Sequence, residues 1–144
     1  MEFTNVVETR RSVREYDASR KVERSVVEEI IKEASYAPSW KNSQTARYHC
    51  IMSEDIIKEV EQECLPEFNA KNADGASAII VASFVNHRSG FERDGSKSNE
   101  LGDGWGCYDL GLNNMIFLLK AHELGLSTLV MGLRDEKKIK ELLN

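Results

Sequence analysis

The sequence predicts an α+β fold in which helices outnumber strands. About five segments carry apolar residues at helical spacing, and three short apolar runs are typical of strands. Strand and helix do not alternate regularly, as they would in a doubly wound parallel sheet. The chain has 144 residues, of which 41% are apolar and 30% charged, so we expect residues 1–144 to form a single domain.

The first half of the chain predicts three helices and one strand. Ser53 is expected to cap the third helix, which carries acidic residues in its first turn, and Pro66 is expected to close it. The expected elements are a helix over 3–9, an extended piece over 12–16, a helix over 22–35, a strand over 48–52 and a helix over 53–66.

The second half holds the clearest strand pattern, an apolar and β-branched run over Ala78–Val85 that we expect to be buried on both faces. Residues 86–104 are polar and rich in glycine, which is typical of a functional or mobile loop. A helix over 105–124 is apolar on nearly all sides, and we expect a partner subunit to cover it. Gly125 should end this helix, before a strand over 127–131 and a last helix capped by Asp135.

The net charge, the N-terminal residues and the cysteine spacing limit which partners, location and metal sites we expect. The formal net charge of −5 excludes nucleic acid and anionic membrane surfaces as main partners. No signal peptide or membrane-spanning run is present, so we expect a cytoplasmic protein. Its three cysteines lack metal-ligand spacing and are expected to be reduced thiols, two of them buried, with no metal site.

The N-terminal segment carries a cluster of cations that fits a phosphate. In an extended chain Arg10, Ser12 and Arg14 share one face, while Arg11 and Val13 point the other way. Two guanidiniums and a hydroxyl on one face can bind phosphate oxygens by charge-assisted hydrogen bonds. Spacing alone leaves open a solvated strand whose arginines pair with neighbouring glutamates.

Three segments resemble the FMN-dependent nitroreductase family, in the order in which that family has them. They are Arg10–Tyr16, Ala37–Gln44, and Asp109–Gly111 together with Leu124–Gly132. The resemblance implies a nitroreductase-like mixed, largely antiparallel sheet wrapped by helices, in an intertwined homodimer with two FMN sites at the subunit interface. The family's usual C-terminal strand and tail are missing here, so the chain is expected to be a truncation or a short variant.

The resemblance also implies which residues contact FMN. The N-terminal cluster would hold the phosphate and ribityl end, the second segment would approach the flavin from the partner, an asparagine would lie on the pyrimidine side, and the last segment would pass along the ring. In chain order these cofactor-binding residues are Arg10, Arg11, Ser12, Arg14, Pro38, Ser39, Asn42, Asn69, Val130, Met131 and Gly132.

The implied activity is that of an NAD(P)H oxidoreductase reducing nitroaromatics, quinones or similar small electrophiles. Hydride would pass through flavin N5 in ping-pong fashion, which requires no catalytic nucleophile from the protein. Alternatives are a flavin-binding or sensory protein with little turnover, another reaction on the same scaffold (dehalogenation, dehydrogenation or flavin breakdown), and a non-flavin interaction module. One departure concerns Gln44, which the family follows with proline and an aromatic residue but this chain with Thr45-Ala46-Arg47.

Overall fold

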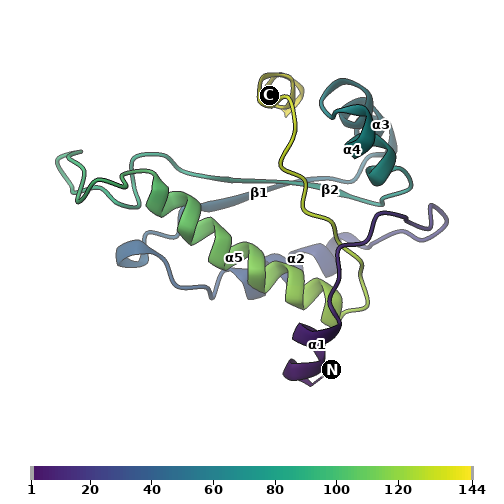
Figure 1. The fold of residues 1–144 in the computed structure, drawn as a ribbon, viewed down its shortest axis with the longest axis horizontal. Helices are drawn as coiled ribbons and strands as arrows, with labels where there is room; N and C mark the ends of the chain where they lie inside the picture. Colours follow the sequence, from purple (N-terminus) through teal and green to yellow (C-terminus); the bar gives the residue numbers. More distant parts are fainter. Residues whose placement is uncertain (1, 144) are drawn as a thin grey trace. The chain divides into compact units, whose positions relative to one another are not determined.

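The computed structural model describes residues 2–143, and their contacts divide them into two compact units. Unit 1 comprises residues 2–10, 24–49 and 81–126, and unit 2 comprises residues 11–23, 50–80 and 127–143. The elements, labelled as in Figure 1, are α1 (Phe3–Thr9), α2 (Arg24–Ala34), the 3-10 turn η1 (Trp40–Asn42), β1 (Ala46–Ile51), α3 (Glu54–Glu63), α4 (Glu67–Ala73), β2 (Ile79–Phe84), α5 (Gly104–Glu123) and α6 (Glu136–Leu143).

The predicted helices are confirmed, and the structure adds one that the sequence reasoning missed. Pro66 closes α3 as expected, but it also stands at the N-cap of α4, where its carbonyl oxygen accepts the N–H groups of Asn69 and Ala70. Proline is well suited to a helix start because its missing N–H would have no partner there. The cap predicted for α6 is also confirmed, since Asp135 Oδ1 accepts the backbone N–H groups of Lys137 and Lys138.

The sheet is small and antiparallel, with β1 paired to β2. The expectation that the 78–85 strand is buried on both faces is wrong, because the residues of β2 are half-buried and Ala82 is exposed. Among the described residues β2 pairs with β1 alone, so one edge of β2 is unpaired there. The strand predicted over 127–131 is also wrong, since only Thr128 forms a bridge there.

Unit 1 is built around α5, which packs against α2 and contacts α1 and η1 (Figure 1). The helix ends at a left-handed Gly125, and Leu126 N–H returns to the carbonyl oxygen of Ala121. Several large side chains of α5 remain exposed within this chain, Tyr108 and Met115 among them. Its buried residues are small or polar: Gly106, Asp109, Asn113 and Ala121.

Unit 2 contains α3 and α4 packed together, with α6 tied to the end of α3. Asp135 N–H donates to the carbonyl oxygen of Cys64 at 2.7 Å, and Lys138 Nζ lies 3.1 Å from a carboxylate oxygen of Glu63. Cys64 is buried, whereas Cys50 and Cys107 are exposed, so the expectation of two buried thiols is wrong. Among the helices described, none combines the length and apolarity that a bilayer crossing requires.

Candidate functional site

The predicted phosphate segment follows α1 directly and is fixed by pairing within unit 2. Arg10 closes α1 with its N–H on the carbonyl oxygen of Val6. Ser12 then forms a parallel bridge with Thr128, and Val13 N–H donates to the Thr128 carbonyl oxygen at 3.1 Å. The side chains of Arg11, Ser12 and Arg14 are exposed.

A second contact fixes the far end of this segment. The hydroxyl of Tyr16 donates to the carbonyl oxygen of Val13 at 3.1 Å, and burial raises the pKa of Tyr16, which Arg14 partly offsets. Gly75 adopts a left-handed φ of 80°, and a β-carbon there would lie 2.9 Å from the Tyr16 carbonyl oxygen. The close approach therefore requires glycine at this position.

The segment that pairs with it presents unused backbone donors. Within the described residues, the N–H groups of Val130, Met131 and Gly132 donate no hydrogen bond. Val130 is 68% exposed, and the guanidinium of Arg134 donates to the Gly132 carbonyl oxygen at 2.9 Å. A row of backbone N–H groups without a partner can donate hydrogen bonds to a ligand that carries acceptor atoms.

Asn69 also belongs to unit 2, but it is buried and its amide is engaged. It is 5% exposed, and its Nδ2 donates to the carbonyl oxygen of Leu133 at 2.9 Å. Leu133 follows directly on Gly132, so the amide ties α4 to the end of the 130–132 segment. This geometry favours a supporting role for Asn69 over a direct bond from that nitrogen to a ligand.

In unit 1, Pro38, Ser39 and Asn42 lie on or beside a strained turn over residues 39–45, called the 39–45 turn below. Lys41, Asn42 and Gln44 have φ values of 46°, 54° and 49°, in the left-handed region that side chains disfavour. Each such residue costs on the order of 1 kcal/mol, so the surrounding contacts must hold the turn in place. Inside the turn, Ser39 Oγ accepts the N–H of Gln44 at 3.0 Å.

A buried polar cluster beneath the turn was missed by the sequence reasoning. Both carboxylate oxygens of Asp109 lie close to the N–H of Trp40, at 3.1 and 3.0 Å, and Ser89 donates its hydroxyl to Asp109 Oδ2 at 2.6 Å. Ser89 Oγ also lies 2.7 Å from Ser43 Oγ and 3.2 Å from Thr45 Oγ1. The one indication in the sequence was a carboxylate in a largely apolar helix, because a carboxylate that is buried there requires a partner.

Aromatic and ionic contacts surround the same turn. The rings of Trp40 and Trp105 have centroids 4.6 Å apart, and Lys41 Nζ lies 2.9 Å from a carboxylate oxygen of Glu92. Trp105 Nε1 donates to Asn99, whereas the buried Trp40 Nε1 has no acceptor among the described residues. The ring of Trp40 on η1 thus packs against the ring of Trp105 on α5 within this chain.

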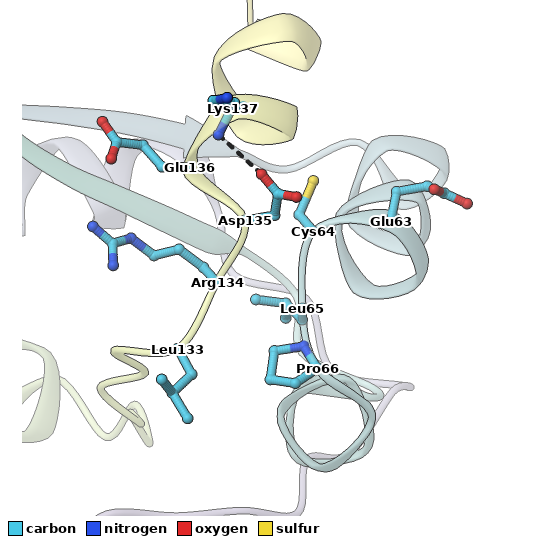
Figure 2. A pocket seen from close by; sticks show the side chains of 9 residues that line it. All are labelled: Glu63, Cys64, Leu65, Pro66, Leu133, Arg134, Asp135, Glu136 and Lys137. Atoms are coloured by element: carbon cyan, nitrogen blue, oxygen red, sulfur yellow. Dashed lines mark hydrogen bonds between the residues drawn. The ribbon is translucent and has the colours of Figure 1, made fainter.

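Unit 2 also contains an open hollow of roughly 690 Å³ (Figure 2). Two of its charged side chains are engaged: Asp135 caps α6 through the bond drawn to Lys137, and Arg134 donates to the carbonyl oxygen of Gly132. The lining contains none of the residues predicted to contact FMN; it consists of Glu63, Cys64, Leu65, Pro66, Leu133, Arg134, Asp135, Glu136 and Lys137. In the part of the chain that the structure describes, no three His, Cys, Asp or Glu side chains gather as a metal site.

Known proteins share both the sequence pattern and the fold. The chain is 33% identical over 102 residues to the Bacillus subtilis protein YdgI, whose name describes an NAD(P)H nitroreductase, covering 70% of this chain and 48% of that one. This chain therefore spans about half the length of that curated relative.

Two solved structures show the same fold. A crystal structure in complex with FMN from Exiguobacterium sibiricum superposes with a TM-score of 0.77 at 24% identity, covering 99% of this chain and 80% of that one. A gut-bacterial enone reductase, CLA-ER, superposes with a TM-score of 0.82 at 21% identity, again over 99% of this chain and 80% of that one. The family model described as the nitroreductase family matches residues 7–144, and the chain belongs to that family.

Proposed function

We propose that this chain binds FMN and, as one half of a cytoplasmic homodimer, passes hydride from NAD(P)H to a small electron acceptor such as a nitroaromatic or a quinone. Membership in the nitroreductase family supports an oxidoreductase role. FMN supplies the redox chemistry when bound, through hydride transfer at flavin N5. The protein's part is then to bind and orient the flavin and leave one ring face open.

The pairing of Ser12 with Thr128 is the observation that carries this proposal. It sets the cation-bearing segment parallel to the start of the segment with unused backbone N–H groups. FMN has a phosphate at one end and a ring bearing hydrogen-bond acceptors at the other. Of the two paired segments, one is cationic and the other has backbone N–H groups that donate to no described residue, and these features match the two ends of FMN.

Each residue has a distinct role in the proposal. Arg10, Arg11, Ser12 and Arg14 hold the phosphate and ribityl end against the repulsion of a protein with a net charge of −5. The backbone at Val130, Met131 and Gly132 follows the ring and offers an N–H near N5. Pro38, Ser39 and Asn42 approach the flavin from the partner subunit, and Asn69 holds the 130–132 segment in place.

Flavin titration tests the proposal. Bound FMN is expected to change its fluorescence on titration with the protein, and Arg14→Ala should weaken binding about tenfold to a hundredfold, because one charge-assisted hydrogen bond is lost. Arg20→Ala is the matched control, an exposed arginine in unit 2 beyond the phosphate segment. Unchanged flavin fluorescence with the wild-type chain would overturn the proposal, and equal affinities of the two variants would overturn the phosphate assignment.

A further inference from the structure

Among the described residues, two buried polar side chains from outside the 39–45 turn hydrogen-bond to it, those of Asp109 and Ser89. Asp109 and Ser89 are 2% and 1% exposed, and Thr45 within the turn is 2% exposed. Asp109 lies in the interior of α5, where the helix needs no side-chain carboxylate as a cap. Both of its oxygens are instead directed at the turn and at the serine beneath it.

The direction of the hydrogen bonds in this cluster follows from the chemistry of its members. A carboxylate only accepts, so Trp40 N–H and the Ser89 hydroxyl both donate to Asp109. Ser89 has then used its one hydrogen and can only accept from Ser43 and Thr45. Every hydroxyl in the cluster therefore points, directly or through Ser89, toward Asp109.

We propose that Asp109 is a positioning residue that holds the 39–45 turn in its strained conformation, directly through Trp40 N–H and indirectly through Ser89. The left-handed backbone at Lys41, Asn42 and Gln44 persists because the buried carboxylate fixes the start of the turn and the serine fixes its end. The consequence for flavin rests on the proposed function, which assigns Pro38, Ser39 and Asn42 to the partner's flavin. The structural part stands without it.

The same arrangement supplies a spectroscopic reporter. Trp40 and Trp105 are the two tryptophans of the chain, and their centroids lie 4.6 Å apart with planes inclined by 47°. Two indoles this close and inclined couple their transitions and give an exciton couplet in circular dichroism. Because Trp40 begins the turn that Asp109 holds, the couplet reports the position of the turn in the flavin-free protein.

Circular dichroism of the flavin-free protein tests the structural part. Asp109→Ala should abolish the couplet, and Asp109→Asn should weaken it, since an amide offers one acceptor oxygen and turns a donor toward the cluster. Glu123→Gln is the matched control, the same carboxylate-to-amide change on an exposed residue of α5, and it should leave the couplet intact. A wild-type couplet in folded Asp109→Ala would overturn the proposal.

If Asp109→Ala does not fold, Asp109→Asn and Ser89→Ala decide the structural part. Ser89→Ala removes the donor to Asp109 and the acceptor for Ser43 and Thr45, so it should weaken the couplet as well. A full couplet in both folded variants would overturn the proposal. A weakened couplet in both, with the helical signal retained, would support it.

Flavin binding tests the functional part separately. Asp109→Asn should bind FMN about tenfold more weakly than the Glu123→Gln control, because the turn no longer holds one conformation. A weakened couplet with unchanged FMN affinity would overturn the positioning role toward flavin. If the wild-type chain binds no FMN, the proposed function fails, while the dichroism result still decides whether Asp109 holds the turn.

Discussion

The side-chain amide of Asn69 donates a 2.9 Å hydrogen bond to the carbonyl oxygen of Leu133. The bond joins α4 to the residue that follows Gly132, in the segment proposed to pass along the flavin. Asn69 is buried, so the hydrogen bond is protected from water. The hydrogen bond to Leu133 explains why a polar side chain is buried at position 69, because buried polar groups in proteins normally have a hydrogen-bond partner.

Asn69→Ala should lower the free energy of unfolding by roughly 1–3 kcal/mol, because the Leu133 carbonyl oxygen loses its buried donor. Urea denaturation measures the change. Asn72→Ala, a half-buried asparagine on the same helix, is the control and should cost less. Equal stabilities of the two variants would show that the bond to Leu133 contributes nothing.

Gly106 and Gly111 lie on the same helix in opposite surroundings. A β-carbon at Gly106 would collide with the ring of Phe84, whereas at Gly111 it would meet nothing within 4 Å. Gly106→Ala should therefore destabilise the chain by roughly 1–3 kcal/mol, and Gly111→Ala should stabilise it by up to about 1 kcal/mol through helix propensity. Thermal unfolding of the two variants checks the opposite signs, and a shared sign would contradict this packing of α5.

Tyr48 should respond to alkaline pH. Burial raises its pKa from 10.0 to about 12, and its hydroxyl donates to Asn114 Oδ1 at 3.0 Å. The folded state binds the proton more tightly than the unfolded state, so this contribution to stability is complete below pH 10 and is lost as pH rises toward about 12. Spectrophotometric titration should show a late phenolate step that Tyr48→Phe removes; a Tyr48→Phe titration that keeps this step would refute the assignment.

The three thiols should differ in reactivity. Cys64 is buried and burial raises its pKa, whereas Cys50 and Cys107 are exposed. Since the thiolate is the reactive form, a thiol reagent should label Cys64 of the native protein more slowly than the other two. Peptide mapping after a short pulse identifies the labelled sites, with urea-unfolded protein as the reference. Fast native labelling of Cys64 would mean that the junction of α3 and α6 opens readily.

Local sequence patterns were sufficient for the family and for every helix except α4. The apolar spacing of α2, α3 and α5, the Gly125 stop and the Asp135 cap depend on near neighbours, which the sequence displays directly. The prediction of a strand over 127–131 was wrong because strands, unlike helices, depend on residues that are distant in the sequence. A strand needs a partner, and only Thr128 pairs among the described residues.

The buried cluster at Asp109 was beyond sequence reasoning for a related reason. Its members come from three distant stretches of chain, and neither Ser89 nor Thr45 carries a local pattern that marks it as buried. The α4 helix was missed because Pro66 was interpreted only as an end of α3, although proline also favours the first turn of a helix. Predicted flavin residues such as Ser12 and Met131 remain predictions that ligand binding must test.

Anaerobic reduction of the FMN-loaded protein tests the central claim most directly. With NADH or NADPH, the absorbance of the oxidised flavin should bleach, and a quinone or nitroaromatic added afterwards should restore it. Flavin that binds but stays oxidised with both nucleotides would contradict the oxidoreductase role and leave a flavin-binding protein with little turnover.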